Sequence, residues 1–291
     1  MKKDLIILHL VILIFGFTGI FGKLISISAE QIVWFRMAIA FLSIGVFLKF
    51  RKIGFKSSKK SVLQFLGAGV IVALHWITFF QSIKVSNVSV GLISLSSASL
   101  FVAILEPILT KRKWRLRDLL FGFLIIPILG WMFYGNLNYL EGIIYGVISA
   151  FLAALFTILN GQFIQHNRAE KISFYEMLGG FLIITAYFGF TGQLGLEMFN
   201  LSFTDISYLL ILGIICTAFA FVAATMVMKT LSPFTVAFSV NLEPVYGILL
   251  ALLIFGDSEF MQTKFYIGAI LIISMIILNG DLKPKVSKKI Y

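Results

Sequence analysis

Long apolar stretches alternate with short polar connections along the chain. Stretches without any charged residue cover residues 5–22, 61–83, 85–105, 119–140, 142–165, 177–196, 206–228 and 265–280. Two more, 31–48 and 230–256, are each interrupted by a single charge, Arg36 and Glu243 respectively. An α-helix needs about 20 apolar residues to cross a hydrocarbon core of about 30 Å. The pattern therefore predicts ten transmembrane helices.

The second half of the chain repeats landmarks of the first half. They recur 146 positions later: Leu66-Gly67 at Leu212-Gly213, Ser86 at Ser232, Val90 at Val236, Ile108 at Ile254, and Gly122 at Gly268. Each half holds five predicted helices, so the second half must enter the membrane from the opposite side. The sequence thus predicts an all-α membrane protein of two inverted five-helix repeats, residues 1–137 and 138–291. Inverted repeats of this kind are typical of secondary transporters.

Composition and charge agree with a protein embedded in a lipid bilayer. Hydrophobic residues make up 59% of the chain and charged residues only 13%, against about 25% in soluble domains. The net charge of +11 does not indicate nucleic-acid binding, because all but four of the 24 lysines and arginines lie at the termini or in alternate connections. By the positive-inside rule, this distribution predicts that both termini are cytoplasmic.

Motifs for catalysis or metal binding do not occur. The three histidines lie in different segments, and neither H-E-x-x-H nor G-x-x-x-x-G-K-[ST] is present. No Cys/His cluster has the spacing of a metal site. The sequence therefore predicts neither an enzyme nor a bound cofactor.

Glu243 and Pro244 stand near the middle of the ninth predicted helix. A carboxylate in lipid costs on the order of 3 kcal/mol, so Glu243 must face protein or water. Pro244 cannot donate to the Val240 carbonyl, which predicts a kink. Ser239, Glu243 and Gly247 predict a polar stripe on one helix face. Glu243 either binds a substrate cation or a proton on a cavity wall, or accepts hydrogen bonds from neighbouring helices.

Two other charged positions have more than one interpretation. Arg36 lies about six residues from the outer end of its helix, from where it could snorkel to the interface. It could instead neutralise a substrate carboxylate or pair with Glu30. Glu106 precedes Pro107, a second expected kink, and the basic residues that follow favour an ion-paired helix end.

Further candidates occur at helical spacing in three predicted helices: His75, Trp76 and Phe79 in the third, Ser97 in the fourth, and Tyr145 and Asn160 in the sixth. The aromatic group in the third helix would line a cavity if its face turns inward, although such residues more often serve packing. The small residues around the serine suit either a cavity or close helix packing. The face in the sixth helix is expected to point to protein and could contact substrate.

The last two predicted helices resemble a known family. They contain the runs Leu242-Glu243-Pro244-Val245, Leu253-Ile254-Phe255-Gly256-Asp257 and Ile267-Gly268-Ala269-Ile270-Leu271-Ile272. These are similar to the L-x-P-V, helix-ending G-E and I-G-A-x-L-I patterns of EamA-type drug/metabolite transporters. Asp257 replaces the usual Glu, and Ser97-Ala98 stand where the first repeat often has proline. The resemblance implies a carrier in the inner (plasma) membrane with a central cavity, often exporting amino acids or related metabolites.

The leading hypothesis is a secondary transporter that exports a small metabolite by alternating access around a central cavity. Proton coupling through Glu243 is one version of this hypothesis. A passive facilitator or channel of the same fold and a non-transporting membrane scaffold stay open as alternatives.

Overall fold

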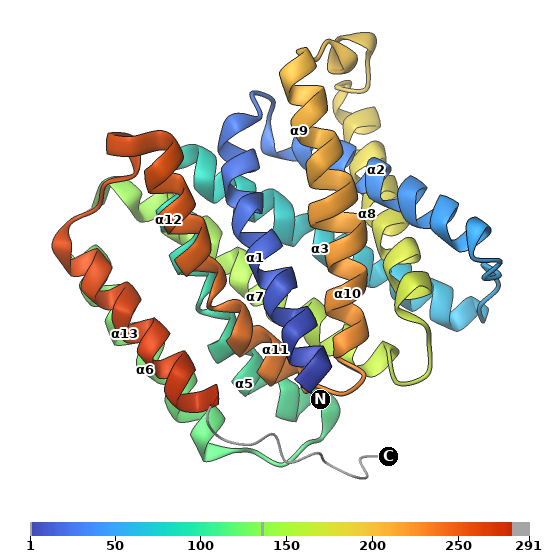
Figure 1. Cartoon of the computed structure of the whole chain (residues 1–291). Helices are drawn as coiled ribbons and strands as arrows, with labels where there is room; N and C mark the ends of the chain where they lie inside the picture. Colours follow the sequence, from blue (N-terminus) through green and yellow to red (C-terminus); the bar gives the residue numbers. More distant parts are fainter. Residues whose placement is uncertain (1, 135–136, 281–291) are drawn as a thin grey trace.

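The chain folds into a bundle of tilted helices (Figure 1). In the computed structural model, which describes residues 2–134 and 137–280, the regular structure is helical and no strand occurs in that part. The helices of the first repeat are α1 (Lys2–Leu24), α2 (Ala29–Phe50), α3 (Lys59–Val85), α4 (Val88–Leu95), α5 (Ala98–Thr110) and α6 (Leu116–Phe133). Those of the second are α7 (Leu140–Phe163), α8 (Ala169–Thr191), α9 (Phe203–Gly213), α10 (Ala220–Val227), α11 (Pro233–Val240), α12 (Glu243–Phe255) and α13 (Thr263–Gly280).

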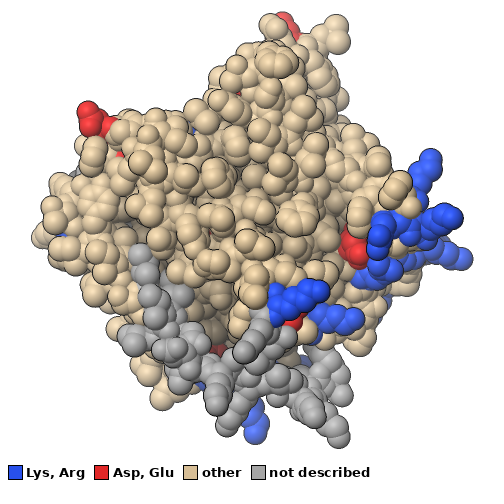
Figure 2. Space-filling view, viewed as in Figure 1, with Lys and Arg blue, Asp and Glu red and all other residues tan. Residues whose placement is uncertain are grey.

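The expected class, an all-helical membrane protein, is confirmed. Within the described ranges, eight helical segments are long and apolar enough to cross a membrane. Figure 2 shows a surface almost free of charge around them, with exposed lysines and arginines gathered at its right edge, where the α2–α3 connection lies. Beside these segments, α6 and α13 pack against each other. The predicted fifth segment, 119–140, extends too far, because α6 ends at Phe133.

Two of the spanning segments are broken at corresponding places. α4 ends at Leu95 and α5 begins at Ala98, while α11 ends at Val240 and α12 begins at Glu243. At the weak point expected beside Pro244, the α-helical hydrogen bonding is interrupted, because Asn241 and Leu242 bond the carbonyls three residues back instead of four. The expected kink at Pro107 is not where the first repeat breaks, because α5 continues through Pro107 to Thr110.

The 146-residue register holds for the last three segments of each repeat. It brings the broken pair α4–α5 onto α11–α12 and α6 onto α13 to within one residue, and α3 onto α9 with α10 to within two residues at the start and four at the end. The first two helices are out of step: α7 begins at Leu140, eight residues before the counterpart of Lys2. Connections of unequal length, including 51–58 and 192–202, absorb this difference.

The two repeats are interlocked. α3 packs on α7 and α8, α2 packs on α8, and α1 packs on α10 and α12. The α3–α8 contact is close enough that a Cβ at Gly69 would collide with the Glu176 carbonyl, and one at Gly179 with the Leu66 carbonyl. Glycine lets the two backbones approach, as small residues commonly do between membrane helices. The space enclosed between the repeats is consequently bounded by helices from both.

Candidate functional site: a cavity between the repeats

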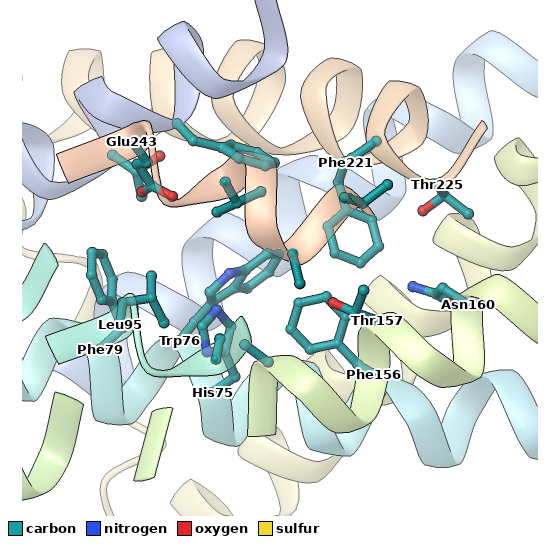
Figure 3. Close-up of a pocket in the computed structure, with 18 of the residues that line it drawn as sticks. His75, Trp76, Phe79, Leu95, Phe156, Thr157, Asn160, Phe221, Thr225 and Glu243 are labelled. Carbon is teal, nitrogen blue, oxygen red and sulfur yellow. The ribbon is translucent and has the colours of Figure 1, made fainter. Parts of the chain in front are cut away.

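A cavity of about 880 Å³, counting its open mouth, lies between the two repeats. Residues of α1, α2, α3, α7 and α10 line it, together with residues at both helix breaks. Its wall is mainly aromatic and aliphatic (Figure 3). The polar lining residues are Thr18, Arg36, His75, Thr157, Asn160, Thr225, Asn241 and Glu243.

Arg36 is held in place by aromatic stacking and by a distorted turn of the opposite repeat. Its guanidinium carbon lies 3.7 Å from the centre of the Trp76 ring. Its Nε donates to Thr217 Oγ1 at 2.5 Å, and Nη2 donates to the Cys216 carbonyl at 3.5 Å. Both acceptors belong to the π-helical turn Ile214–Phe219, which joins α9 to α10. Such turns are frequent at functional sites.

The suggestion that Arg36 snorkels to the interface is wrong. The residue is 1% exposed and borders the cavity, and its acceptors come from the second repeat rather than from Glu30. Nη1 is buried and has no hydrogen-bond partner in the part of the chain described. A donor thus stays unused beside the cavity.

Glu243 is the first residue of α12, directly after the break. It is 5% exposed and lines the cavity. Within residues 2–134 and 137–280, its carboxylate makes no hydrogen bond or ion pair, so it does not pair with Arg36. The positive end of the α12 dipole favours a negative charge in this first turn. A basic and an acidic side chain, one from each repeat, therefore border one cavity without a direct contact between them.

Aromatic residues form the middle of the cavity wall. Trp76 meets Phe221 edge to face at 5.8 Å between ring centres, and Phe156 lies 5.9 Å from the same ring. His75 lies 2.9 Å from the Ser149 carbonyl through Nδ1. Because a carbonyl only accepts, this geometry assigns a proton to Nδ1. Phe79 also lines the cavity, next to Leu95 and Glu243 in Figure 3.

Three expected site residues do not line the cavity. Tyr145 and Ser239 are half-buried elsewhere, and Ser97 is buried with its hydroxyl donating to the Ser94 carbonyl. The prediction that Ser239, Glu243 and Gly247 share one face required one continuous helix. Between α11 and α12, the N–H groups of Asn241 and Leu242 bond the carbonyls three residues back instead of four. The four-residue spacing is therefore not kept there, and Asn241 lies at the wall.

The sequence analysis also missed several lining residues. Thr18, Thr157, Thr225, Asn241 and Phe221 belong to the wall but were not selected. Thr157 lies between Phe156 and Asn160, which both face the cavity, so helical spacing could have indicated it. Thr217, the partner of Arg36, depends on the π-helical turn, for which the sequence carries no comparable signal.

Glu106 forms the ion pair expected of it. Its carboxylate lies 2.7 Å from Arg112 Nη1. The cavity does not include this pair.

The cavity lies toward one side of the membrane segments. At one end it reaches Met228, just after α10, and Asn160, three residues before the end of α7. At the other end its outermost residues, Thr18 and Phe79, are each six residues from the ends of α1 and α3. The end that the cavity approaches more closely is the one that carries the basic connections with Arg168, Lys171 and Lys229.

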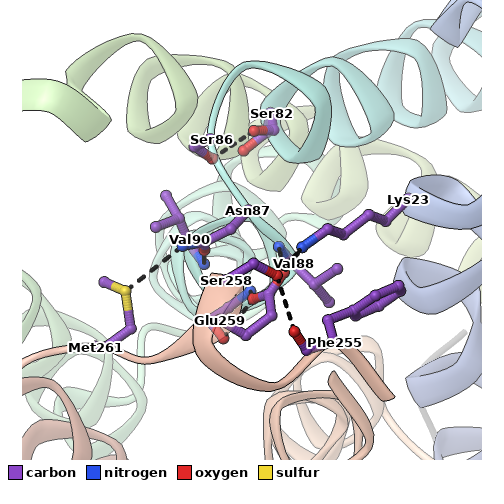
Figure 4. Close-up of polar contacts among 11 residues, drawn as sticks. Lys23, Ser82, Ser86, Asn87, Val88, Val90, Phe255, Ser258, Glu259 and Met261 are labelled. Carbon is purple, nitrogen blue, oxygen red and sulfur yellow. Dashed lines mark hydrogen bonds and ion pairs between the residues drawn. The ribbon is translucent and has the colours of Figure 1, made fainter. Parts of the chain in front are cut away.

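A polar cluster, the Glu259 cluster, lies at the other side of the membrane segments (Figure 4). Glu259 is fully buried and accepts from the backbone N–H groups of Val88 and Ser89, both at 3.0 Å, and from the Ser89 hydroxyl at 2.9 Å. Lys23 Nζ lies 2.9 Å from the same carboxylate. One acidic side chain therefore joins the end of α1, the start of α4 and the turn after α12.

Comparison with known proteins agrees with this architecture. Residues 2–134 and 140–280 each match the EamA-like transporter family. The chain belongs to this family. An uncharacterized transporter of Bacillus subtilis (strain 168), YxxF, is 25% identical over 263 residues, which span 86% of the chain and 81% of the relative. One solved crystal structure superimposes with a TM-score of 0.73 over 95% of the chain and 96% of its own, at 11% identity, and shares the fold. A member of the EamA-like family is a membrane transporter rather than an enzyme.

Proposed function

We propose that the protein is a secondary transporter that exports a small metabolite by alternating access, with the cavity as its binding site. The observation that carries this proposal is that a basic and an acidic side chain, Arg36 and Glu243, border the cavity from different repeats and make no ion pair with each other in the described chain. Buried charges are costly unless they are paired, so a ligand that neutralises both gains binding free energy.

The lining favours a small zwitterion with an apolar side chain, such as an amino acid. The unused Nη1 of Arg36 suits a carboxylate, and the Glu243 carboxylate suits an ammonium group. Trp76, Phe156 and Phe221 provide an apolar surface for the remainder of the substrate. Rotation of the two repeats about this site would expose it to each side in turn.

The proposal includes ten membrane-spanning segments, with α6 and α13 among them, in the bacterial plasma membrane. The basic connections and both termini then face the cytoplasm. In that orientation, the cavity reaches toward the cytoplasm, from which we propose that it loads, and the Glu259 cluster lies at the outer side. A site that loads from the cytoplasm supports export.

An untargeted comparison of released and retained metabolites tests this function. Cells that carry the wild-type protein should release more of one metabolite class than cells that carry Glu243→Gln. Glu141→Gln, at the exposed start of α7, is the matched control and should export as the wild type does. Full export by Glu243→Gln would contradict the assigned role. No released metabolite, together with copurification of one fixed partner, would favour a scaffold.

A further inference from the structure

A second carboxylate lies behind the cavity wall. Glu176, on α8, is 0% exposed and packed where α8 meets α3. In the described chain, its one hydrogen bond comes from Asn160 Nδ2, 3.4 Å from Oε2. Asn160 also lines the cavity, at the opposite end from Glu243 in Figure 3. One amide side chain therefore separates this acid from the cavity.

No cation compensates Glu176 from the neighbouring helices. α8 packs against α2, α3 and α10, and α10 contains no titratable residue. Arg36 is bonded to Thr217 and the Cys216 carbonyl, and His75 to Ser149. The other charged residues of α2 and α3 lie near helix ends: Glu30, Lys49, Lys59, Lys60 and Lys84.

Titratable groups on α8 and α7 are also engaged or distant. Glu170 pairs with Arg168, while Lys171 and Tyr175 bond the carbonyls of Lys56 and Phe55. On α8, Tyr187 is exposed. The titratable residues of α7, Glu141 and Tyr145, lie fifteen or more positions before Asn160. Neutralisation of Glu176 must therefore come from a proton rather than from a basic side chain.

The atoms left without partners indicate where that proton lies. Glu176 Oε1 and Asn160 Oδ1 are both buried, and neither has a donor among the residues described. An ionised carboxylate can only accept, so it would leave both oxygens unsatisfied. A protonated carboxyl gains a donor on Oε1, and the amide that already bonds Oε2 through Nδ2 holds in Oδ1 an acceptor without a partner, so we infer a bond between these two oxygens. Protonation thus satisfies both atoms in an acid–amide pair with two hydrogen bonds.

We propose that Glu176 is a proton-binding site that communicates with the transport cavity through Asn160. In the protonated state, both polar atoms of the Asn160 amide are engaged by the acid. When the proton passes from Oε1 to water in the cavity, Oδ1 loses its donor and can accept from a substrate, while Nδ2 stays bonded to the carboxylate. This inference rests on the proposed transport function, and it assigns one coupled proton to a site distinct from Glu243.

Infrared spectroscopy of the purified protein tests the proton site without a substrate. Wild type at neutral pH should show the carbonyl stretching band of a protonated carboxylic acid. Glu176→Gln should lose the band, and Glu170→Gln, on the same helix, should keep it. The assignment would be overturned if the band disappears in Glu243→Gln and persists in Glu176→Gln. So would the absence of any such band in the wild type.

Proteoliposomes with an internal pH indicator then test coupling. Substrate should drive proton movement in the wild type, and Glu176→Gln should reduce it at least tenfold while exchange of labelled for unlabelled substrate continues. Glu176→Asp, which can still titrate, should restore part of the proton movement. Unchanged proton movement in Glu176→Gln, or exchange without proton movement in the wild type, would overturn the inference and leave the transport function intact. Absence of exchange in the wild type would instead contradict the proposed function itself.

Discussion

Arg36 shows how a single residue can be held firmly and still keep a donor unused. Stacking on Trp76 and the bonds to Thr217 and Cys216 fix the plane of the guanidinium. The remaining nitrogen, Nη1, is buried beside the cavity. A lysine would keep the charge but could not reproduce this fork of donors.

We therefore expect Arg36→Lys to weaken substrate affinity by about tenfold or more, since a hydrogen bond to a charged group is worth about 1.5–3 kcal/mol. The Michaelis constant for transport into proteoliposomes measures this effect. Arg168→Lys, on the exposed α7–α8 connection, is the control and should leave the constant unchanged. An unchanged constant in Arg36→Lys would show that the guanidinium does not contact the substrate.

Residue positions could be anticipated from sequence only where one helix is continuous. His75, Trp76, Phe79 and Asn160 lie in unbroken helices, and the structure places all four at the cavity wall. Ser239 was placed by spacing that crosses the break after α11, and it lies elsewhere. The depth of Arg36 was misjudged because its acceptors come from a π-helical turn in the other repeat.

At the scale of helices, close packing of α3 against α8 depends on glycine. We expect Gly69→Ala to lower stability by about 1–3 kcal/mol, because the added Cβ must displace the α8 backbone at Glu176. Gly67→Ala, on the same helix with open space around its Cβ, is a matched control and should not lower stability. Thermal unfolding in detergent compares the two variants. Equal melting temperatures would refute the packing argument.

The Glu259 cluster gives a second prediction at this scale. Glu259→Gln removes the charge that holds Lys23 and the start of α4 together. Loss of one charge-assisted hydrogen bond, worth about 1.5–3 kcal/mol, should favour opening of this side by about tenfold or more. An impermeant maleimide added from the closed side should then label a cysteine at position 18 faster. If the cysteine is labelled at the same rate with Glu259→Gln as with Glu259, the cluster does not control closure of this side of the cavity.

The sequence largely predicts where helices form, but it only partly predicts where they are interrupted. Long apolar runs located the eight confirmed candidate spans, and Pro244 indicated a weak point in the second repeat. No proline marks the corresponding break at Ser96 and Ser97, where the hydroxyls of Ser97 and Ser99 donate to the carbonyls of Ser94 and Ser96. Local hydrogen bonding of that kind competes with the helix without a distinctive pattern.

At the scale of the molecule, the repeat produces similar scaffolds with different chemistry. The broken segments correspond, yet the first repeat has Ser97 where the second has Glu243. The positive charge comes from α2 of the first repeat and the negative charge from α12 of the second. Movement of one repeat against the other would therefore change the distance between these charges, which links the binding site directly to the alternation of access.

Counterflow in proteoliposomes is the most direct test of alternating access through this cavity. The vesicles are loaded with an unlabelled amino-acid mixture, and uptake of trace labelled amino acids is followed. Our account predicts that unlabelled substrate inside accelerates and transiently concentrates the label, and that Glu243→Gln abolishes this effect. If unlabelled substrate on the opposite side does not accelerate uptake of the label, the protein is a passive pore, and this result would contradict the account.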